Sequence, residues 1–266
     1  MLTAELNALF RRTRVRVLLV SMFAIPVLLA LAVYASGGPS AGRGPSFLDQ
    51  VSHNGVFAAL AGLSVTIGFF LPLVVAVVAG DTIAGEASLG TLRYLLIRPA
   101  GRVRLLGVKA ITVAIFCVAA AVAVALGGLI AGAVLFPIGP VVSLSGTTLP
   151  LADGIGRTLA AAGLVGVSLF GLGAIGIFIS TLTDVPVGAI AATVAAAVVS
   201  AILDAVPQVH AIHPWLLTHQ WLSFGDLLRT PVRGHNIVRD LLLQAGYVAV
   251  FGTAAWARFT TRDVTA

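Results

Sequence analysis

Charged residues are scarce in this chain, and that scarcity decides its class. Only 10% of the 266 residues are Asp, Glu, Lys or Arg, whereas 59% are apolar. An ordinary soluble domain carries about 25% charged residues. The shortage of charge excludes a typical soluble domain and predicts a protein that crosses a membrane several times.

Cysteine and lysine are each represented once. Cys117 is the lone cysteine, so no disulfide can form within the chain, and we interpret it as a small apolar packing residue. Lys109 is the only lysine, and the sequence around it lacks the glycine spacing and the hydroxyl of a phosphate-binding loop. We therefore expect no ATPase site of that class, no enzymatic activity and no cofactor in this chain.

Acidic residues are absent from the long apolar runs. All ten lie at the ends of runs or between them: Glu5, Asp49, Asp81, Glu86, Asp153, Asp184, Asp204, Asp226, Asp240 and Asp263. A carrier driven by protons or sodium usually places acids inside its spans. An intramembrane protease needs a Ser with a His, or paired Asp residues, at membrane depth. Neither class is favoured.

Six runs free of Asp, Glu, Lys and Arg are each long enough to cross a bilayer as a helix. They cover residues 17–35, 56–79, 110–136, 158–182, 185–203 and 241–257. The first run has no clear cleavage site and is followed by five more of its kind, so we do not interpret it as a signal peptide. We expect an all-α, polytopic integral membrane protein with a single transmembrane domain over residues 1–266.

Basic residues predict the orientation of these spans. Eleven of the sixteen fall in the amino end, the loop after the second run and the carboxyl tail, and five fall on the other side. Because positive residues in short loops stay in the cytoplasm, both termini should be cytoplasmic, in the plasma (inner) membrane. Lying at membrane borders, these residues favour contact with anionic lipid rather than nucleic acid.

Residues 1–16 leave two interpretations open. Leu2, Leu6, Leu9 and Phe10 have the spacing of an amphipathic helix on the inner membrane surface, with arginines following. The alternative is a frayed basic tail that only sets the orientation.

Most of the histidines lie between the fifth and sixth runs, at His210, His213, His219 and His235. Imidazoles three residues apart on a helix share a face, so His210, His213 and His219 raise the question of a transition-metal site. Pro214 discourages a regular helix there. Trp215, Trp221 and Phe224 are typical of the aromatic belt at a membrane surface. We therefore expect ordinary interfacial polar residues and no metal site.

The fourth and fifth runs are joined by a short turn. Thr183 or Asp184 can cap the next helix, and Pro186 suits its first turn, where a missing N–H does no harm. The sequence predicts a tight antiparallel hairpin. An intramembrane proton relay through Asp184 is the weaker alternative, because the residue lies between two full spans.

Residues 80–109 form the only long charged segment between two runs. The pattern predicts a helix end around Asp81 and Glu86, a break at Gly90, and a short cytoplasmic helix over residues 91–97 that stops before Pro99. Leu89, Leu92, Leu95 and Leu96 would give it one apolar face. Such a helix either docks into a groove on a partner protein or lies on lipid head groups.

Three patches of this sequence resemble those of type-2 ATP-binding-cassette (ABC) transporter permeases, and they occur in the order found in that family. The first, after the second run, has the pattern Asp81-x4-Glu86-x3-Gly90-Thr91-Leu92-Arg93-Tyr94-Leu95-Leu96-x2-Pro99-x2-Arg102, with Lys109 following. The second is the sequence FISTLTDVP at residues 178–186, followed by ILD at 202–204. The third is PWLLTHQW at residues 214–221. The resemblance covers nearly the whole chain.

The resemblance implies the membrane subunit of a bacterial ABC exporter. Such a six-span subunit pairs with a second permease copy, identical or not, and with two separate ATP-binding subunits that hold the ATP and magnesium. The short helix after the second span is a coupling element in that family. A secondary carrier and a non-transporting membrane scaffold remain the alternatives.

Carried over residue by residue, the resemblance assigns roles in contact with the ATPase. Glu86, Arg93 and Arg102 are candidates for the coupling electrostatics, and Gly90 and Thr91 for the turn that orients the helix. Asp81, Leu92, Leu96 and Pro99 complete the candidate coupling set. The alternative is that the charged members only cap helices and hold the topology.

Overall fold

The computed structural model describes residues 2–36, 47–90 and 101–261, and these ranges are almost entirely helical. The helices are α1 (Leu2–Arg11), α2 (Thr13–Ala35), α3 (Leu48–Val51), α4 (Val56–Ile67), α5 (Phe70–Ser88), α7 (Arg102–Leu135), α8 (Leu151–Ser168), α9 (Phe170–Leu182), α10 (Pro186–Asp204), the 3₁₀ helices η1 (Pro207–Trp215) and η2 (Trp221–Leu228), and α11 (Gly234–Thr261). Two-residue strands β1 (Val141–Val142) and β2 (Thr148–Leu149) pair antiparallel in one connecting loop. The predicted all-α class is confirmed.

Six stretches are long and apolar enough to cross a membrane: Thr13–Ala35, Phe70–Ser88, Val103–Leu135, Leu151–Leu182, Pro186–Asp204 and Gly234–Thr261. This agrees with the predicted polytopic membrane protein. Several helices continue past the charge-free runs, because charged side chains at helix ends can extend toward the head groups. The last helix begins at Gly234, well before the predicted start at residue 241.

The second run is not one helix. It is divided into α4 and α5 at Gly68 and Phe69, and Phe69 has non-helical backbone angles. Pro72, in the first turn of α5, has no N–H to donate to the carbonyl of Gly68, and its ring crowds that carbonyl. The candidate span is α5, which extends to Ser88, and the short α4 that precedes it is almost wholly buried.

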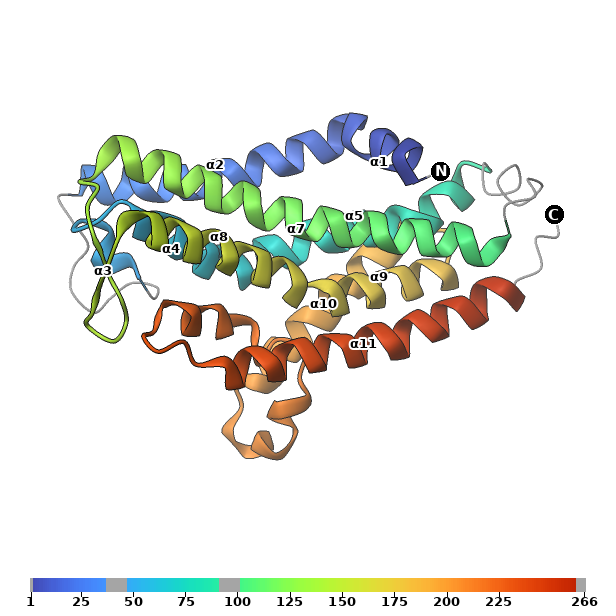
Figure 1. Cartoon of the computed structure of the whole chain (residues 1–266). Helices are drawn as coiled ribbons and strands as arrows, with labels where there is room; N and C mark the ends of the chain where they lie inside the picture. The colour runs from blue at the N-terminus through green and yellow to red at the C-terminus, as the bar shows by residue number, and fades with distance from the viewer. Residues whose placement is uncertain (1, 37–46, 91–100, 262–266) are drawn as a thin grey trace.

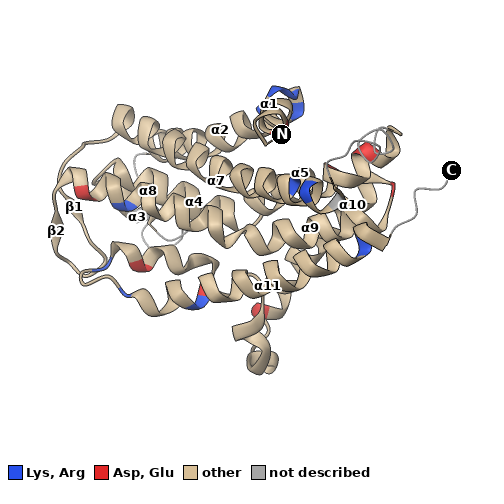
Figure 2. Ribbon diagram, turned by 45° about the vertical axis from the view of Figure 1, so that its right-hand side comes forward, with Lys and Arg blue, Asp and Glu red and all other residues tan. Residues whose placement is uncertain are grey.

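The amino-terminal segment is helical rather than a frayed tail over residues 2–11. Helix α1 packs Leu9 and Phe10 against the core, and the chain bends at Arg12 into α2. The start of α1, the end of α5 and the end of α11 lie at one end of the bundle, which we call the terminal end (Figure 1). Strands β1 and β2 and helix α3 lie at the opposite end. Most Lys, Arg, Asp and Glu residues lie toward the two ends of the bundle, and most of the helical residues between the ends are uncharged (Figure 2).

The centre of the bundle is formed by α4, α5, α7 and the α8–α9 pair. In the apolar 18-residue stretch of α8–α9, 72% of the residues are buried. The corresponding stretches of α2, α10 and α11 have 22%, 22% and 11% of their residues buried. The last three helices therefore present most of their apolar surface outward, to lipid or to another protein chain.

Close helix packing in this centre depends on glycines of α7. A Cβ atom added to Gly127, Gly128 or Gly132 would overlap the backbone of Phe23 in α2, Ala59 in α4 or Gly55 just before α4, respectively. Because backbone atoms cannot move aside as a side chain can, only glycine permits these approaches.

Candidate functional site

The candidate coupling residues are only partly within the described ranges. Asp81 and Glu86 lie in the last turns of α5, and Gly90 follows that helix with a φ of +68°, a conformation that favours glycine. The predicted helix end and break are therefore present. Arg102 begins α7. Thr91, Leu92, Arg93, Leu96 and Pro99, with the predicted short helix, lie outside the described residues.

Lys109 is the most buried of the described charged side chains at the terminal end. Its side chain is 3% exposed, and its Nζ lies 2.6 Å from Glu86 Oε1 and 3.1 Å from Glu5 Oε1. The ammonium group of α7 thus joins the end of α5 to α1. A charge at this depth requires partners to offset its lost hydration, so the two carboxylates hold three helices in one arrangement.

A second ion pair at this end is looser. Arg12, at the junction of α1 and α2, places Nη1 3.5 Å from Asp81 Oδ2, and its side chain is 51% exposed. Exposed pairs of this kind contribute about 0–1 kcal/mol. The rigid connection at the end of α5 is therefore the Lys109 cluster, which we define as Glu5, Glu86 and Lys109.

Ser180 attaches the same part of α5 to α9. Its hydroxyl donates to the carbonyl oxygen of Gly80 (2.7 Å) and accepts from the N–H groups of Ile83 (3.0 Å) and Ala84 (2.8 Å). The side chain is fully buried. One hydroxyl thus enters the backbone hydrogen bonding of a neighbouring helix and fixes α9 against α5.

We expect Ser180→Ala to lower the free energy of unfolding by about 2 kcal/mol, because buried backbone groups of α5 lose a partner that water cannot replace. Thermal unfolding of the purified chain in detergent measures this as a lower Tm. Ser64→Ala is the matched control, since among the described residues the Ser64 hydroxyl bonds only to the carbonyl oxygen of Leu60 in its own helix. Equal Tm losses in the two variants would show that the hydrogen bonds between α5 and α9 add no stability beyond that of a hydroxyl bonded within its own helix.

A cavity of about 930 Å³ opens at the terminal end beside these contacts. Its walls come from α1, α2, α5, α7 and the start of α10, and its polar lining includes Glu5, Arg12, Asp81, Glu86 and Lys109. Charged and apolar side chains thus share one hollow at the end of α5.

The turn between α9 and α10 borders the same cavity through Pro186 and Val187. Pro186 is the first residue of α10, as predicted. The N-cap residue is Val185, and the Thr183 hydroxyl accepts the Val185 N–H at 3.0 Å instead of capping the helix directly. Asp184 lies in the turn between the two helices, so the tight hairpin is present.

Asp240 differs from the expectation that the acidic residues lie at span ends or in loops. Because α11 begins at Gly234, Asp240 lies inside a candidate span, and it is 0% exposed. Ser168 donates a hydrogen bond to Asp240 Oδ2, and Gln244 Nε2 donates to Oδ1 at 3.1 Å. Gln244 Oε1 also accepts the N–H of Gly171 at 3.2 Å.

These bonds attach α11 to the break between α8 and α9. The sequence did not predict this group of Ser168, Asp240 and Gln244. Hydropathy gave no sign that α11 begins at Gly234, before Arg239 and Asp240. The only available signal was the spacing of Asp240 and Gln244, four residues apart and so on one face of a helix.

Comparison with known proteins gives a family and no function. The family model described as "Protein of unknown function (DUF2705)" matches residues 27–265. No curated protein matches the chain. The match includes all six candidate spans, although it starts inside the first. The chain therefore belongs to the DUF2705 family, whose function is unknown, and its six candidate spans are those of a multi-pass membrane protein.

Proposed function

We propose that this chain is the membrane-spanning permease subunit of an ATP-driven ABC exporter. It pairs with a second permease copy, and separate ATP-binding subunits dock at the terminal end, which faces the cytoplasm. The proposal combines the resemblance of residues 81–102, 178–186 and 214–221 to type-2 ABC permeases with the contacts around the end of α5.

The Lys109 cluster is the observation that carries the proposal. Its bonds join α5 to α1 and α7 at the border of the apolar region, directly before the segment expected to meet the ATPase. Ser180 joins α5 to α9 a turn earlier. A displacement applied to the segment after α5 would therefore move several helices together, as the switch between inward- and outward-facing states requires.

The outward surfaces of α2, α10 and α11 fit pairing with a second permease copy. They carry large exposed apolar residues, among them Leu28, Val199 and Leu242. Lipid covers part of such a surface, and a second copy that packs against the rest would place the substrate path between the two chains. In this design the partner subunit binds the ATP and magnesium.

Co-purification in mild detergent with candidate ATP-binding subunits from the same organism tests the proposal. We expect a stable complex whose ATP turnover depends on the permease. Arg93→Ala should weaken assembly at least about tenfold, because the proposal pairs Arg93 with a charge of the ATPase and truncating one partner of a buried interface pair costs about 2 kcal/mol or more. Glu86→Ala should weaken assembly as well, because it removes a partner of Lys109 at the end of α5. Arg233→Ala is the control, since Arg233 is an exposed residue that precedes α11.

Glu86→Ala also removes a partner of Lys109, so Arg93→Ala separates coupling from folding. Unchanged assembly and turnover in Arg93→Ala would place the contact elsewhere. If the wild-type chain binds no ATPase, an ATP-driven mechanism is lost. The buried Asp240 then favours a secondary carrier, because an ionisable residue inside a span is the usual site of ion coupling.

A further inference from the structure

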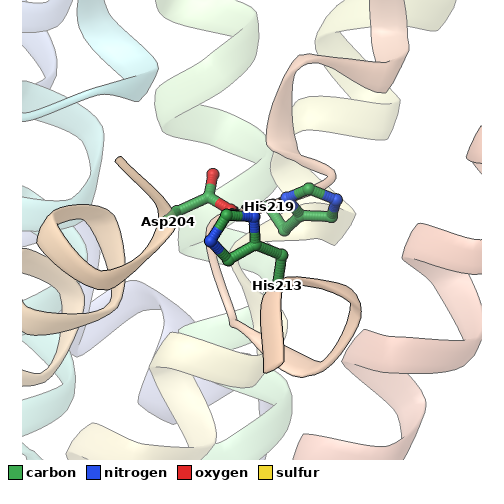
Figure 3. A group of neighbouring side chains, drawn as sticks. All are labelled: Asp204, His213 and His219. Atoms are coloured by element: carbon green, nitrogen blue, oxygen red, sulfur yellow. Dashed lines mark hydrogen bonds and ion pairs between the residues drawn. The ribbon is translucent and has the colours of Figure 1, made fainter. Parts of the chain in front are cut away.

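Two histidines and a carboxylate meet where α10 ends. Asp204 is the last residue of α10, His213 lies in η1, and His219 lies in the turn between η1 and η2. Figure 3 shows both imidazole rings next to the carboxylate of Asp204. One potential ligand atom from each residue lies within 4.8 Å of the other two. His210, which the sequence placed with these histidines, is not a member of the group, and Asp204 replaces it.

The hydrogen bonds of His213 prepare one of its nitrogens to bind a cation. Its Nε2 lies 3.2 Å from the carbonyl oxygen of Val206, which can only accept, so Nε2 carries the proton in the neutral ring. The lone pair is then on Nδ1, which lies 4.0 Å from Asp204 Oδ1. Metal-binding histidines commonly donate their other N–H to a backbone carbonyl in this way.

His219 is held on the other side of the carboxylate. Its Nδ1 lies 2.6 Å from Asp204 Oδ1. The preceding residue, Thr218, is bound to α10, because its N–H donates to Ser200 Oγ at 3.2 Å and the two hydroxyls lie 3.0 Å apart. Leu217 is buried beside it. The backbone that carries His219 is therefore positioned before any ligand arrives.

We propose that Asp204, His213 and His219 form a binding site for a divalent transition metal ion, with Zn²⁺ as the best fit. Imidazole nitrogens and a carboxylate are ligands that zinc prefers. In a tetrahedral site with bonds of about 2.1 Å, neighbouring ligand atoms lie about 3.4 Å apart. The two distances to Asp204 Oδ1, 2.6 and 4.0 Å, lie on either side of that value.

Binding requires the loss of one proton. His219 Nδ1 must release the proton that it shares with Asp204, and the proton leaves to solvent as the nitrogen takes its place on the metal. The side chains remain accessible to an incoming ion, with 28%, 18% and 32% of their surfaces exposed for Asp204, His213 and His219. Three protein ligands leave a fourth position for water.

A bound ion would fasten the segment after α10 to the end of that helix. The metal site does not rest on the proposed transport function. Its ligands share no residue with the Lys109 cluster, which carries that proposal.

Metal titration of the full chain tests this site. The protein is purified in detergent with a tag that contains no histidine, stripped with a chelator, and titrated with Zn²⁺ by calorimetry and with Co²⁺ by visible absorption. We expect one ion per chain. His213→Ala and Asp204→Asn should each lower the affinity for the metal about 100-fold. Loss of a residue that only orients a ligand already costs about 10- to 100-fold, and loss of the ligand itself should cost at least as much.

Two variants make the test decisive. His210→Ala removes a neighbouring histidine of η1 that is not in the group, so it should bind as the wild type does. Asp204→Asn keeps an oxygen that can accept from His219, so its Tm without metal should match the wild type even if His213→Ala folds poorly. Wild-type binding no tighter than that of Asp204→Asn, or an equal loss in His210→Ala, would overturn the proposal.

Discussion

Lys109→Met is expected to lower the free energy of unfolding by about 3 kcal/mol. Methionine keeps most of the apolar stem but removes the ammonium group, which leaves Glu86 and Glu5 without the charge that both contact. Breaking a buried ion pair from one side costs about 3–5 kcal/mol, because the remaining charge stays in a poorly hydrated place. We take the lower end because the Glu5 side chain is 30% exposed. Thermal unfolding in detergent should show the loss as a lower Tm.

Two further variants identify the cause. Arg104→Ala removes an exposed basic residue from the same helix and should change the Tm little. Exchanging the partners in Lys109→Glu/Glu86→Lys should recover part of the stability that Lys109→Glu alone loses, because attraction then replaces repulsion. A Tm for Lys109→Met equal to that of the wild type would mean that the cluster does not hold α1, α5 and α7 together.

Gly132→Ala should destabilise the bundle by a similar amount, about 3 kcal/mol. The added methyl group would overlap the backbone of Gly55 just before α4, and neither backbone can shift without moving a whole helix. The match of these two glycines is mutual, since a Cβ at Gly55 would meet the backbone of Gly132. Thermal unfolding in detergent again provides the measurement.

Gly107→Ala is the matched control in the same helix. A Cβ at Gly107 meets no atom within 4 Å, so alanine should leave the Tm unchanged or raise it. Alanine is about 1 kcal/mol more favourable than glycine in a helix. The two substitutions are chemically identical, so the difference between their Tm values measures the close approach at Gly132. If Gly132→Ala is as well tolerated as Gly107→Ala, α4 and α7 do not approach as closely as described.

Hydropathy was sufficient to predict the class because a span requires a long apolar run whatever it packs against. The all-α fold, the six apolar segments and the tight hairpin before Pro186 all follow from local sequence. The break of the second run was predictable in principle. Pro72 removes a hydrogen-bond donor in the middle of that run, and the divided helix, α4 and α5, reflects it.

The sequence by itself therefore determined the membrane class, the approximate positions of the apolar segments and the chemistry available to the chain. Tertiary structure alone decided the partners: Lys109 with Glu5, Asp240 with Ser168, and Asp204 with His213 and His219. Residues 104 positions apart, as in the Lys109–Glu5 pair, meet only because helices pack side by side. Local patterns determine which face of a helix is apolar. Which helix packs against that face depends on how closely the backbones can approach, and here glycines such as Gly132 determine that distance.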